Sequence, residues 1–347
     1  MLENILYGAS GVENGLIRGI VGVIATLLFV SLNVLFLIWL ERKIIARIHV
    51  RYGPNRAGRY GMLQPIADMI KLLTKEGIVP KDADKITYNT APWVAFLFAL
   101  LPAAAIGIAT GLISTNISIG LLYIVAVSSL STIAVIMAGW GSNNKYSLLG
   151  AMRTAAQSLS YEMPLVLSMI GIVAIVGSLN TQNIVAAQSH AWLGIIPKWF
   201  IFYQPLAFVV FFSAVVAEMG RIPFDLQESE SELVAGFHTE YGGMKFAMFM
   251  FAEYTHLVVG SALVVTLFFG GWYLPVVSGI FANMGYINYI VQIAIFVAKM
   301  YVIIFILIWI RGTLTRTRIN KMLSFGWKTL LPLALINIVI TGVILSL

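Results

Sequence analysis

The sequence contains no cysteine, and only 11% of its 347 residues are charged. The missing thiols exclude disulfides, thiolate metal sites and cysteine-ligated iron–sulfur clusters on this chain. Any iron–sulfur electron carrier that works with the protein would therefore belong to a partner. Histidine is also scarce, and the four histidines show no metal-ligand spacing, so no metal site is predicted. They are His49, His190, His238 and His256.

The sequence is instead rich in hydrophobic residues, which make up 59% of it. Soluble proteins are usually about a quarter charged, so this composition indicates an integral membrane protein. We expect one polytopic, all-α membrane domain over residues 1–347. The first apolar run extends to Trp39 without a small-residue cleavage site, which favours a true first span over a removable signal peptide.

Apolar runs close to the roughly 20 residues that cross a bilayer predict eight transmembrane helices. Each should be helical almost throughout, because backbone polar groups in lipid must find partners within the segment. The fourth is the weakest, and a helix that begins near Met152 is as compatible with the sequence as one that begins at Glu162. The expected spans are 16–40, 91–112, 119–140, 162–178, 199–219, 245–269, 287–310 and 327–345.

Positive charge is distributed unevenly among the expected loops. The loops after helices 1, 3, 5 and 7 hold seventeen of the twenty-two Lys and Arg residues, whereas the loops after helices 2, 4 and 6 hold only Lys198. The positive-inside rule then places the odd-numbered loops on the cytoplasmic side and both termini outside. The net charge of +7 therefore reflects the membrane topology, and it also favours contact with anionic lipid or an acidic partner. No motif indicates nucleic-acid binding.

The first cytoplasmic loop, residues 42–85, contains a predicted amphipathic helix. Within GMLQPIADMIKLLTKE, four apolar residues recur at helical spacing, opposite a polar face that includes Asp68. Sixteen residues with four charges cannot span a bilayer, so we expect this helix to lie in the membrane interface. Packing on a partner is the alternative. The apolar stripe is Leu63, Ile66, Ile70 and Leu73.

The ionisable residues within or at the ends of predicted spans include Glu162, Glu218, Glu253 and Lys299. A charged side chain at the bilayer centre costs about 2.5 to 3.5 kcal/mol on insertion scales, so such residues usually have a function. The functional interpretation is a chain of titratable groups that passes protons. The alternative is local pairing, for example of Lys299 with Glu162 or Glu253, that only holds helices together. His256 by itself is more typical of a polar packing residue.

The most acidic segment is the predicted cytoplasmic loop 219–244. Six of the fifteen carboxylates lie between Glu218 and Glu240. If the segment is helical, Asp225, Glu228 and Glu232 share one face, where cations, protons or water must compensate their repulsion. A simple solvated loop is the alternative. The apolar residues that are interleaved with these acids favour a lined cavity beside the membrane.

Six segments together resemble signature sequences of the quinone-site membrane subunit of proton-pumping NADH dehydrogenase (respiratory complex I). The similarity runs in order over nearly the whole chain. The segments are WLERK (39–43), RYGPNRAGRYGMLQPIADMIKLLTKE (51–76), SLSYEMPL (158–165), AEMGRIPFDLQESESELVAGFHTEY (217–241), KFAMFMFAEY (245–254) and WIRGTLTRTR (309–318).

The resemblance implies eight core spans and a junction between the membrane arm and the hydrophilic redox arm of a translocase. The chain would form a quinone chamber there without holding a complete active site. Quinone would be the substrate, no cofactor would be bound covalently, and flavin and iron–sulfur clusters would lie on partner subunits. Those partners include the redox-arm subunit with the terminal cluster, small membrane subunits, antiporter-like subunits and membrane lipid. The expected location is a prokaryotic cytoplasmic membrane.

The resemblance also assigns expected roles to residues at matching motif positions. The quinone entrance and chamber would be lined by Glu41, Arg42, Arg51, Asp68 and Arg153. The acidic loop that responds to quinone reduction would comprise Asp225, Glu228, Glu230, Glu232 and Glu240. The proton path would begin with Glu162, Glu218 and Glu253, and Lys299 resembles a family lysine of the seventh span.

Two residues depart from the family pattern, and other functions stay open. The loop reads DLQESESELV where many relatives have DLPEAESELV, so Gln227 and Ser229 indicate a separate lineage. The electron donor could be NADH, coenzyme F420 or ferredoxin, and a membrane-bound hydrogenase component is a further alternative. A free-standing secondary transporter is the third, although no inverted hydropathy repeat supports it.

Overall fold

The computed structural model describes residues 12–189, 191–192, 196–225, 233–275, 277 and 286–346. Most of this part is helical, and its two strands, β1 (Ala191–Trp192) and β2 (Ile196–Pro197), form a small antiparallel pair. Glu228, Glu230 and Glu232 lie outside the described residues. The helices are α2 (Val12–Ile48), α3 (Gln64–Thr74), α4 (Lys85–Leu100), α5 (Gly120–Gly141), α6 (Lys145–Val176), α7 (Thr181–Ala187), α8 (Phe200–Tyr203), α9 (Pro205–Glu218), α11 (Gly243–Phe268), α13 (Tyr286–Thr313), α14 (Ile319–Phe325) and α15 (Leu331–Ser346), with short η1 (Arg59–Gly61), η2 (Leu101–Ala105), η3 (Gly236–His238) and η4 (Gly326–Leu330).

In the described residues, seven helical segments are long and apolar enough to cross a membrane. They correspond to seven of the eight expected spans. The remaining span, expected at 199–219, is divided at Gln204 into α8 and the 14-residue α9. The all-helical fold is therefore confirmed, and the count of eight spans stays a prediction.

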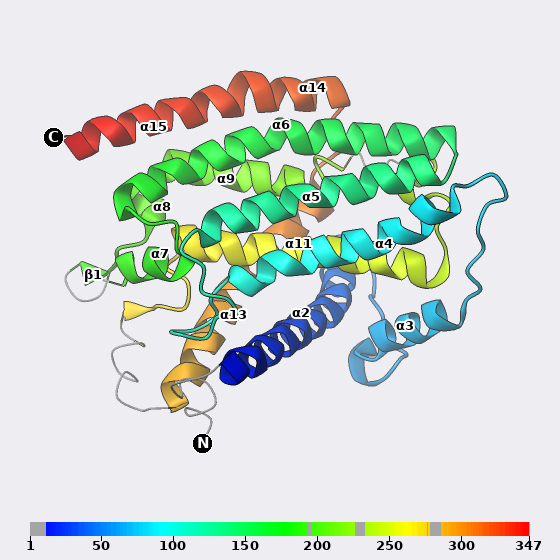
Figure 1. Cartoon of the computed structure of the whole chain (residues 1–347), viewed down its shortest axis with the longest axis horizontal. Helices are drawn as coiled ribbons and strands as arrows, with labels where there is room; N and C mark the ends of the chain where they lie inside the picture. Colours follow the sequence, from blue (N-terminus) through cyan, green and yellow to red (C-terminus); the bar gives the residue numbers. More distant parts are fainter. Residues whose placement is uncertain are drawn as a thin grey trace.

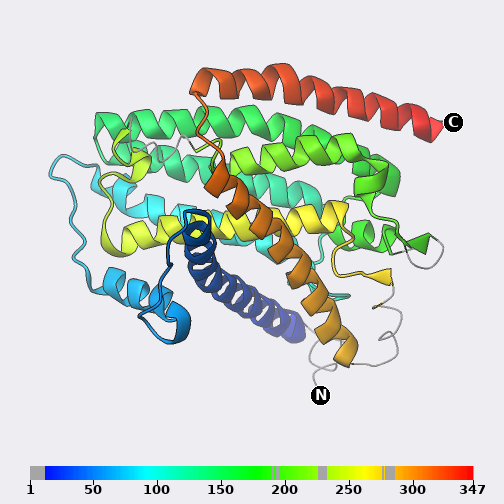
Figure 2. The ribbon, with the colours of Figure 1, turned by 180° about the vertical axis from the view of Figure 1, so that it is seen from behind.

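The long helices form a bundle around α11 (Figures 1 and 2). Helices α4, α5, α6, α9 and α11 run side by side, α2 and α13 cross the bundle obliquely, and α14–α15 packs on the outside of α6. The main hydrophobic cluster of the core includes Phe211, Leu257 and Phe268, and polar side chains such as Gln157 and Ser168 are buried as well. The connections α2–α4, α5–α6, α9–α11 and α13–α14 all lie at one end, which we call the basic end. The expected odd-numbered loops thus share one end of the bundle.

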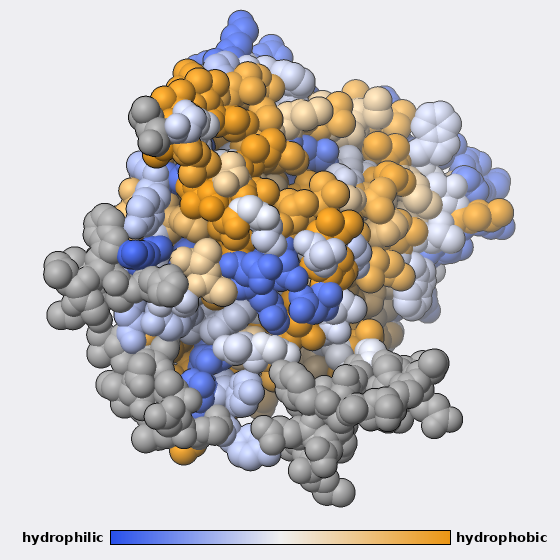
Figure 3. All heavy atoms as spheres, turned by 60° about the vertical axis from the view of Figure 1, so that its left-hand side comes forward, coloured by the Kyte–Doolittle hydropathy of each residue, from blue (hydrophilic) through white to orange (hydrophobic). Residues whose placement is uncertain are grey.

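Much of the outer surface is hydrophobic. Figure 3 shows broad apolar areas with hydrophilic residues gathered in separate patches. Exposed side chains of α2 include Ile24, Leu28 and Leu32, and α15 exposes Val339 and Ile344. Contiguous apolar surface of this extent is typical of a face that contacts lipid or other membrane helices.

Capping residues set helix starts that the apolar runs did not predict. Helix α4 begins at Lys85 rather than 91, because the Asp84 carboxylate accepts hydrogen bonds from the Thr87 hydroxyl at 2.5 Å and the Ile86 N–H at 3.2 Å. The bond from Thr87 lowers the pKa of Asp84. Helix α6 begins at Lys145, earlier than either expected start, where the Asn144 side chain accepts from the Tyr146 N–H at 2.9 Å.

Helix ends differ from the expected ones as well. Helix α2 continues to Ile48, so the first part of the expected loop 42–85 belongs to the helix. Helix α4 stops at Leu100 and passes into η2 instead of reaching residue 112. Pro102 stands at the start of η2, where it cannot donate a backbone hydrogen bond to a continuing helix.

The expected helix of the first loop is present as α3, which is shorter than sixteen residues. It spans Gln64–Thr74 and exposes Ile66, Ile70 and Leu73 on one side. The glycine-rich turn before it is tight: Gly61 has φ +76, and a Cβ there would lie 2.1 Å from the Pro54 carbonyl oxygen. Only glycine fits such a position. Placement of α3 in a membrane interface stays a prediction.

Candidate functional site

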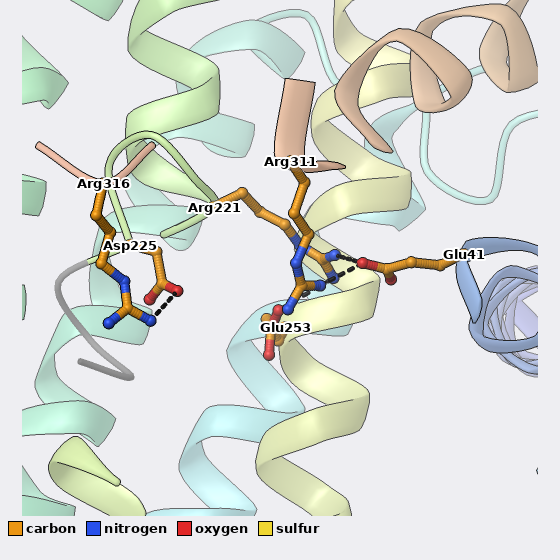
Figure 4. Close-up of polar contacts among 6 residues, drawn as sticks. All are labelled: Glu41, Arg221, Asp225, Glu253, Arg311 and Arg316. Atoms are coloured by element: carbon orange, nitrogen blue, oxygen red, sulfur yellow. Dashed lines mark hydrogen bonds and ion pairs between the residues drawn. The ribbon is translucent and has the colours of Figure 1, made fainter. Parts of the chain in front are cut away.

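Four charged side chains from distant parts of the sequence meet at the basic end (Figure 4). Arg221 places Nη1 2.5 Å from Oε1 of Glu41 and Nη2 3.0 Å from Oε1 of Glu253. Arg311 donates to the same Glu41 oxygen. Two carboxylates and two guanidinium groups balance in formal charge. We call these residues the four-charge cluster.

The chain reversal after α9 brings Arg221 into the bundle. Gly220 has φ +62, a left-handed conformation that favours glycine and commonly ends a helix. The next residue is Arg221, whose guanidinium lies 4.9 Å from the centre of the Tyr254 ring. The side chains of Arg221 and Glu41 are each 3% exposed. Charges this deeply buried are tolerated when they are paired, and loss of one partner is strongly destabilising.

A cavity of about 420 Å³ lies beside Glu41 at the basic end. We call it the arginine cavity, because three arginines stand in its wall. Its volume lies within the range of small-molecule sites. Helix α2, the turn 51–54, α11 and α13 all contribute to the wall. The lining residues are Glu41, Arg42, Ile45, Ala46, Arg51, Tyr52, Gly53, Pro54, Tyr254 and Arg311.

Three of the five residues predicted for the quinone site line this cavity, namely Glu41, Arg42 and Arg51. Asp68 stands one contact behind the wall, where its carboxylate accepts from Arg42 at 2.6 Å. The other Asp68 oxygen accepts from the Gln64 side chain at 2.9 Å. Arg153 is half-buried on α6 and is not among the residues that line the arginine cavity.

A second, smaller cavity of about 70 Å³ lies deeper among α4, α5, α6, α9 and α11. We call it the polar cavity. It contains the carboxylate-bearing residues Glu218 and Glu253 in its wall, and its volume is sufficient for a few water molecules. The other polar lining residues are Ser131, Thr132, Thr154, Ser158 and His256, and the apolar ones are Ala95, Val135, Met219, Phe237, Phe249 and Ala252.

The four-charge cluster joins the two cavities. Glu41 lines the arginine cavity, Glu253 lines the polar cavity, and Arg221 contacts both carboxylates. Two further residues influence Glu218: Ser128 lies close to its carboxylate, and Glu162 lies near enough to repel it electrostatically. The structure therefore brings together the three acids that are predicted to begin a proton path.

The described ends of the acidic loop are held by neighbouring connections. Asp225 is 5% exposed and accepts from Arg316 at 3.1 Å (Figure 4), and Glu240 accepts from the Asn144 side chain at 2.6 Å. Thr317 donates from its N–H and its hydroxyl to the Pro223 carbonyl, at 3.0 and 2.9 Å. The linker between α13 and α14 thus contacts the loop where it leaves α9.

His238 lies within the second half of the same loop, between the Phe237 and Phe246 rings. Burial lowers the pKa of His238 to about 4, against a smaller opposing effect of the Asp225 carboxylate. The imidazole is therefore neutral near pH 7.

Lys299 lies apart from these carboxylates. Its Nζ donates to the carbonyls of Phe269, Gly271 and Tyr273 at 2.8, 3.0 and 2.7 Å, just beyond the end of α11 that is remote from the basic end. In place of the alternative pairing with Glu162 or Glu253, Lys299 makes these three bonds.

Sequence patterns do not identify four residues of the two cavities and the cluster between them. By sequence, Arg221 and Arg311 are only positive loop charges, Tyr254 is only part of a motif, and His256 is typical of a packing residue. A signal is present, because Arg221 follows Glu218 by three residues and Tyr254 adjoins Glu253. The ion pair of Arg221 with Glu41 joins residues 180 positions apart, which no local pattern predicts.

Known proteins similar to this chain agree on one family. The family described as NADH dehydrogenase matches residues 21–342. The H subunit of NADH-quinone oxidoreductase from Dehalococcoides mccartyi (strain CBDB1) is 51% identical over 314 residues, which cover 90% of this chain and 83% of the relative. The protein of the same description from Geobacillus thermodenitrificans (strain NG80-2) is 47% identical over 348 residues, covering 100% of this chain and 99% of the relative.

Proposed function

The chain belongs to the NADH dehydrogenase family, and we propose that it is the quinone-site membrane subunit of a proton-translocating NADH:quinone oxidoreductase. The chain lacks the cysteines that would hold an iron–sulfur cluster, so electrons reach the quinone from a partner. The relatives belong to NADH-quinone oxidoreductases, which favours NADH as the electron source over coenzyme F420 or ferredoxin. The observation that carries the proposal is the contact of Arg221 with Glu41 and Glu253, one on each cavity wall.

The quinone headgroup binds in the arginine cavity. Reduction to quinol takes up two electrons and two protons, and negative charge develops on the quinone oxygens as the electrons arrive. Arg42, Arg51 and Arg311 line the cavity and stabilise that charge. Asp68 positions Arg42 through their 2.6 Å ion pair. Arg153 is assigned to the chamber on the family resemblance alone.

Proton coupling begins when the charge near Glu41 changes. One terminal nitrogen of Arg221 contacts Glu41 and the other contacts Glu253. A stronger ion pair of Arg221 with one carboxylate therefore weakens its ion pair with the other. Glu253 then exchanges a proton with the polar cavity, where Glu218 is the next acid. Glu162 follows Glu218 in the path. Such coupling requires two alternative arrangements of the cluster.

The acidic loop transmits the same event at the surface of the basic end. Asp225 and Glu240 anchor its described ends through Arg316 and Asn144. Glu228, Glu230 and Glu232 supply the charge that responds to quinone reduction, as the family resemblance implies.

The contacts of Lys299 support a different role from proton transfer. An ammonium group has three donors, and its contacts to three carbonyls account for all of them. Lys299 therefore fixes the end of α11 against α13, and we propose that it acts on the proton path only by holding α11 in place.

The basic end faces the cytoplasm of a prokaryotic cell and receives the hydrophilic redox arm, and both termini lie outside. The lipid-facing sides of the bundle contact small membrane subunits and antiporter-like subunits. Eight spans cross the membrane, with α8 and α9 as the fifth, and α3 lies in the interface.

Substitution of Arg51 tests the quinone site. Arg51→Gln removes a charge from the cavity wall, and Arg56→Gln removes one from the same α2–α3 connection outside the wall. A charged hydrogen bond contributes about 1.5 to 3 kcal/mol, so we expect the quinone KM to rise at least about tenfold in Arg51→Gln and to stay unchanged in Arg56→Gln. Transfer to a soluble acceptor that bypasses the quinone checks assembly. Equal KM values in both variants, with assembly intact, would exclude this cavity as the quinone site.

A further inference from the structure

A second concave surface at the basic end lies outside the two cavities of the proposed function. It is a groove of about 490 Å³ between the last turns of α2 and α13. Three pairs of residues at i, i+4 spacing form it, so each pair stands on one face of its helix. They are Lys43 with Arg47, Ile44 with Ile48, and Phe305 with Trp309. We call it the α2–α13 groove.

The walls of the groove are apolar and accessible. Phe305 is 46% exposed and Trp309 55%, and their ring centres are 6.2 Å apart. Gly312 closes the groove toward the basic end, because the α13 backbone there approaches Ile48 so closely that a Cβ would lie 2.7 Å from it. Toward the middle of the bundle, Phe36 and Val302 continue the exposed apolar surface on the same two helices.

The charges in the groove have one sign. Lys43 and Arg47 are cationic, and none of the lining residues is acidic. Lys43 Nζ donates one hydrogen bond to the Asn55 side chain at 2.5 Å, and an ammonium group has two more donors. Arg47 is exposed and brings a guanidinium that suits phosphate oxygens.

This combination selects the chemistry of the occupant. Two cations next to exposed apolar walls are complementary to an amphipathic anion. Its phosphate would contact the cations, and its hydrocarbon would lie along Phe36, Val302 and Phe305. A neutral quinone tail would form no ion pair with the two cations. A partner transmembrane helix would need an acidic residue opposite Lys43 and Arg47, and acidic residues are rare in transmembrane segments. Tryptophan at the membrane interface and basic grooves between transmembrane helices are typical of headgroup contacts.

We propose that the α2–α13 groove is a binding site for one anionic phospholipid, whose phosphate is held by Lys43 and Arg47 and whose acyl chains lie along Phe305, Phe36 and Val302. The site is distinct from the arginine cavity: Glu41 and Arg42 line that cavity, whereas Lys43 and Ile44 line the groove. The proposal does not depend on the identity of the quinone or of the electron donor.

Photo-crosslinking in the assembled complex tests the site. The complex is reconstituted into phosphatidylcholine vesicles that carry a photoactivatable probe, either phosphatidylglycerol or phosphatidylcholine, and labelled peptides are mapped by mass spectrometry. We expect the phosphatidylglycerol probe to label residues 43–48 and 305–309 several-fold more than the phosphatidylcholine probe does.

Variants separate specific binding from general attraction to charge. Lys43→Gln with Arg47→Gln should abolish the preference for phosphatidylglycerol. Arg318→Gln with Lys321→Gln removes the same charge from exposed positions at the same end and should preserve it. The exchange Lys43→Arg with Arg47→Lys keeps the charge and should also preserve it.

Two results would overturn the proposal. Equal labelling of the groove by both probes in the unsubstituted complex would show that the cations do not select the lipid. No label on residues 43–48 and 305–309 from either probe, with other outer surfaces of the complex labelled, would show that no lipid occupies the groove. Both readouts use the unsubstituted complex, so they hold even if a variant fails to assemble.

Discussion

Arg221 and Glu41 form a buried ion pair at 2.5 Å, each with only 3% of its side chain exposed, although 180 positions separate them in the sequence. The same guanidinium contacts Glu253 at 3.0 Å. Arg221 therefore connects Glu41 in the wall of the arginine cavity to Glu253 in the wall of the polar cavity.

Replacement of Arg221 should cost both stability and activity. Arg221→Gln removes the guanidinium that contacts Glu253 and one of the two that contact Glu41, and removal of one partner from a buried pair costs about 3 to 5 kcal/mol. We expect a lower melting temperature of the complex and a loss of quinone reductase turnover. Arg318→Gln, at an exposed position, should change neither. Arg221→Lys should recover only part of the stability, because a single ammonium nitrogen cannot replace the two guanidinium nitrogens that contact the two carboxylates.

The polar cavity should be sensitive to loss of a single hydroxyl. Thr154→Val replaces a lining hydroxyl by a methyl group of similar size and should lower the number of protons translocated per electron in proteoliposomes. Thr266→Val is the matched control, since both threonines are buried and donate to a carbonyl of their own helix, at 3.0 and 2.9 Å. Equal proton-to-electron ratios in both variants would remove the polar cavity from the path.

Lys299→Met separates a structural role from a role in proton transfer. The substitution leaves the carbonyls of Phe269, Gly271 and Tyr273 without their donor, so the melting temperature of the complex should fall. The proton-to-electron ratio of the remaining assembled enzyme should be unchanged. A normal melting temperature with a reduced ratio would instead place Lys299 in the proton path.

His238 should make the complex sensitive to acid. Burial lowers its pKa to about 4 in the folded protein, whereas an unfolded histidine has a pKa of about 6.5. The unfolded state then binds more protons, so this residue's contribution to stability is retained above pH about 6.5 and is lost as pH falls toward 4. The melting temperature of the complex should fall more steeply over this window than that of His238→Gln. Parallel curves for the two proteins would contradict the prediction.

The sequence predicts well what depends on local composition. Apolar runs locate seven long helices, because bilayer length and backbone hydrogen bonding constrain each segment separately. Loop charge predicts which connections lie together at one end of the bundle. Motif resemblance likewise selects Glu41, Arg42 and Arg51, which line one cavity.

Contacts across the bundle could not be predicted in this way. Lys299 is central in its helix by sequence, yet its long side chain reaches carbonyls beyond the end of α11, because α13 crosses the bundle obliquely. His256 is typical of a packing residue by sequence, yet α11 places it on the wall shared with Glu218 and Glu253. The starts of α4 and α6 depend on single capping side chains, Asp84 and Asn144, that lie outside the apolar runs.

The central claim is that Arg221 couples Glu41 to Glu253, and a double-mutant cycle on the quinone KM tests it most directly. Glu253 does not line the arginine cavity, so Glu253→Gln by itself should change the quinone KM only through Arg221. We predict that Glu41→Gln and Glu253→Gln combine non-additively, by at least about 0.5 kcal/mol, and that this coupling disappears in an Arg221→Lys background. Strictly additive effects, or an unchanged KM in Glu253→Gln, would contradict the claim.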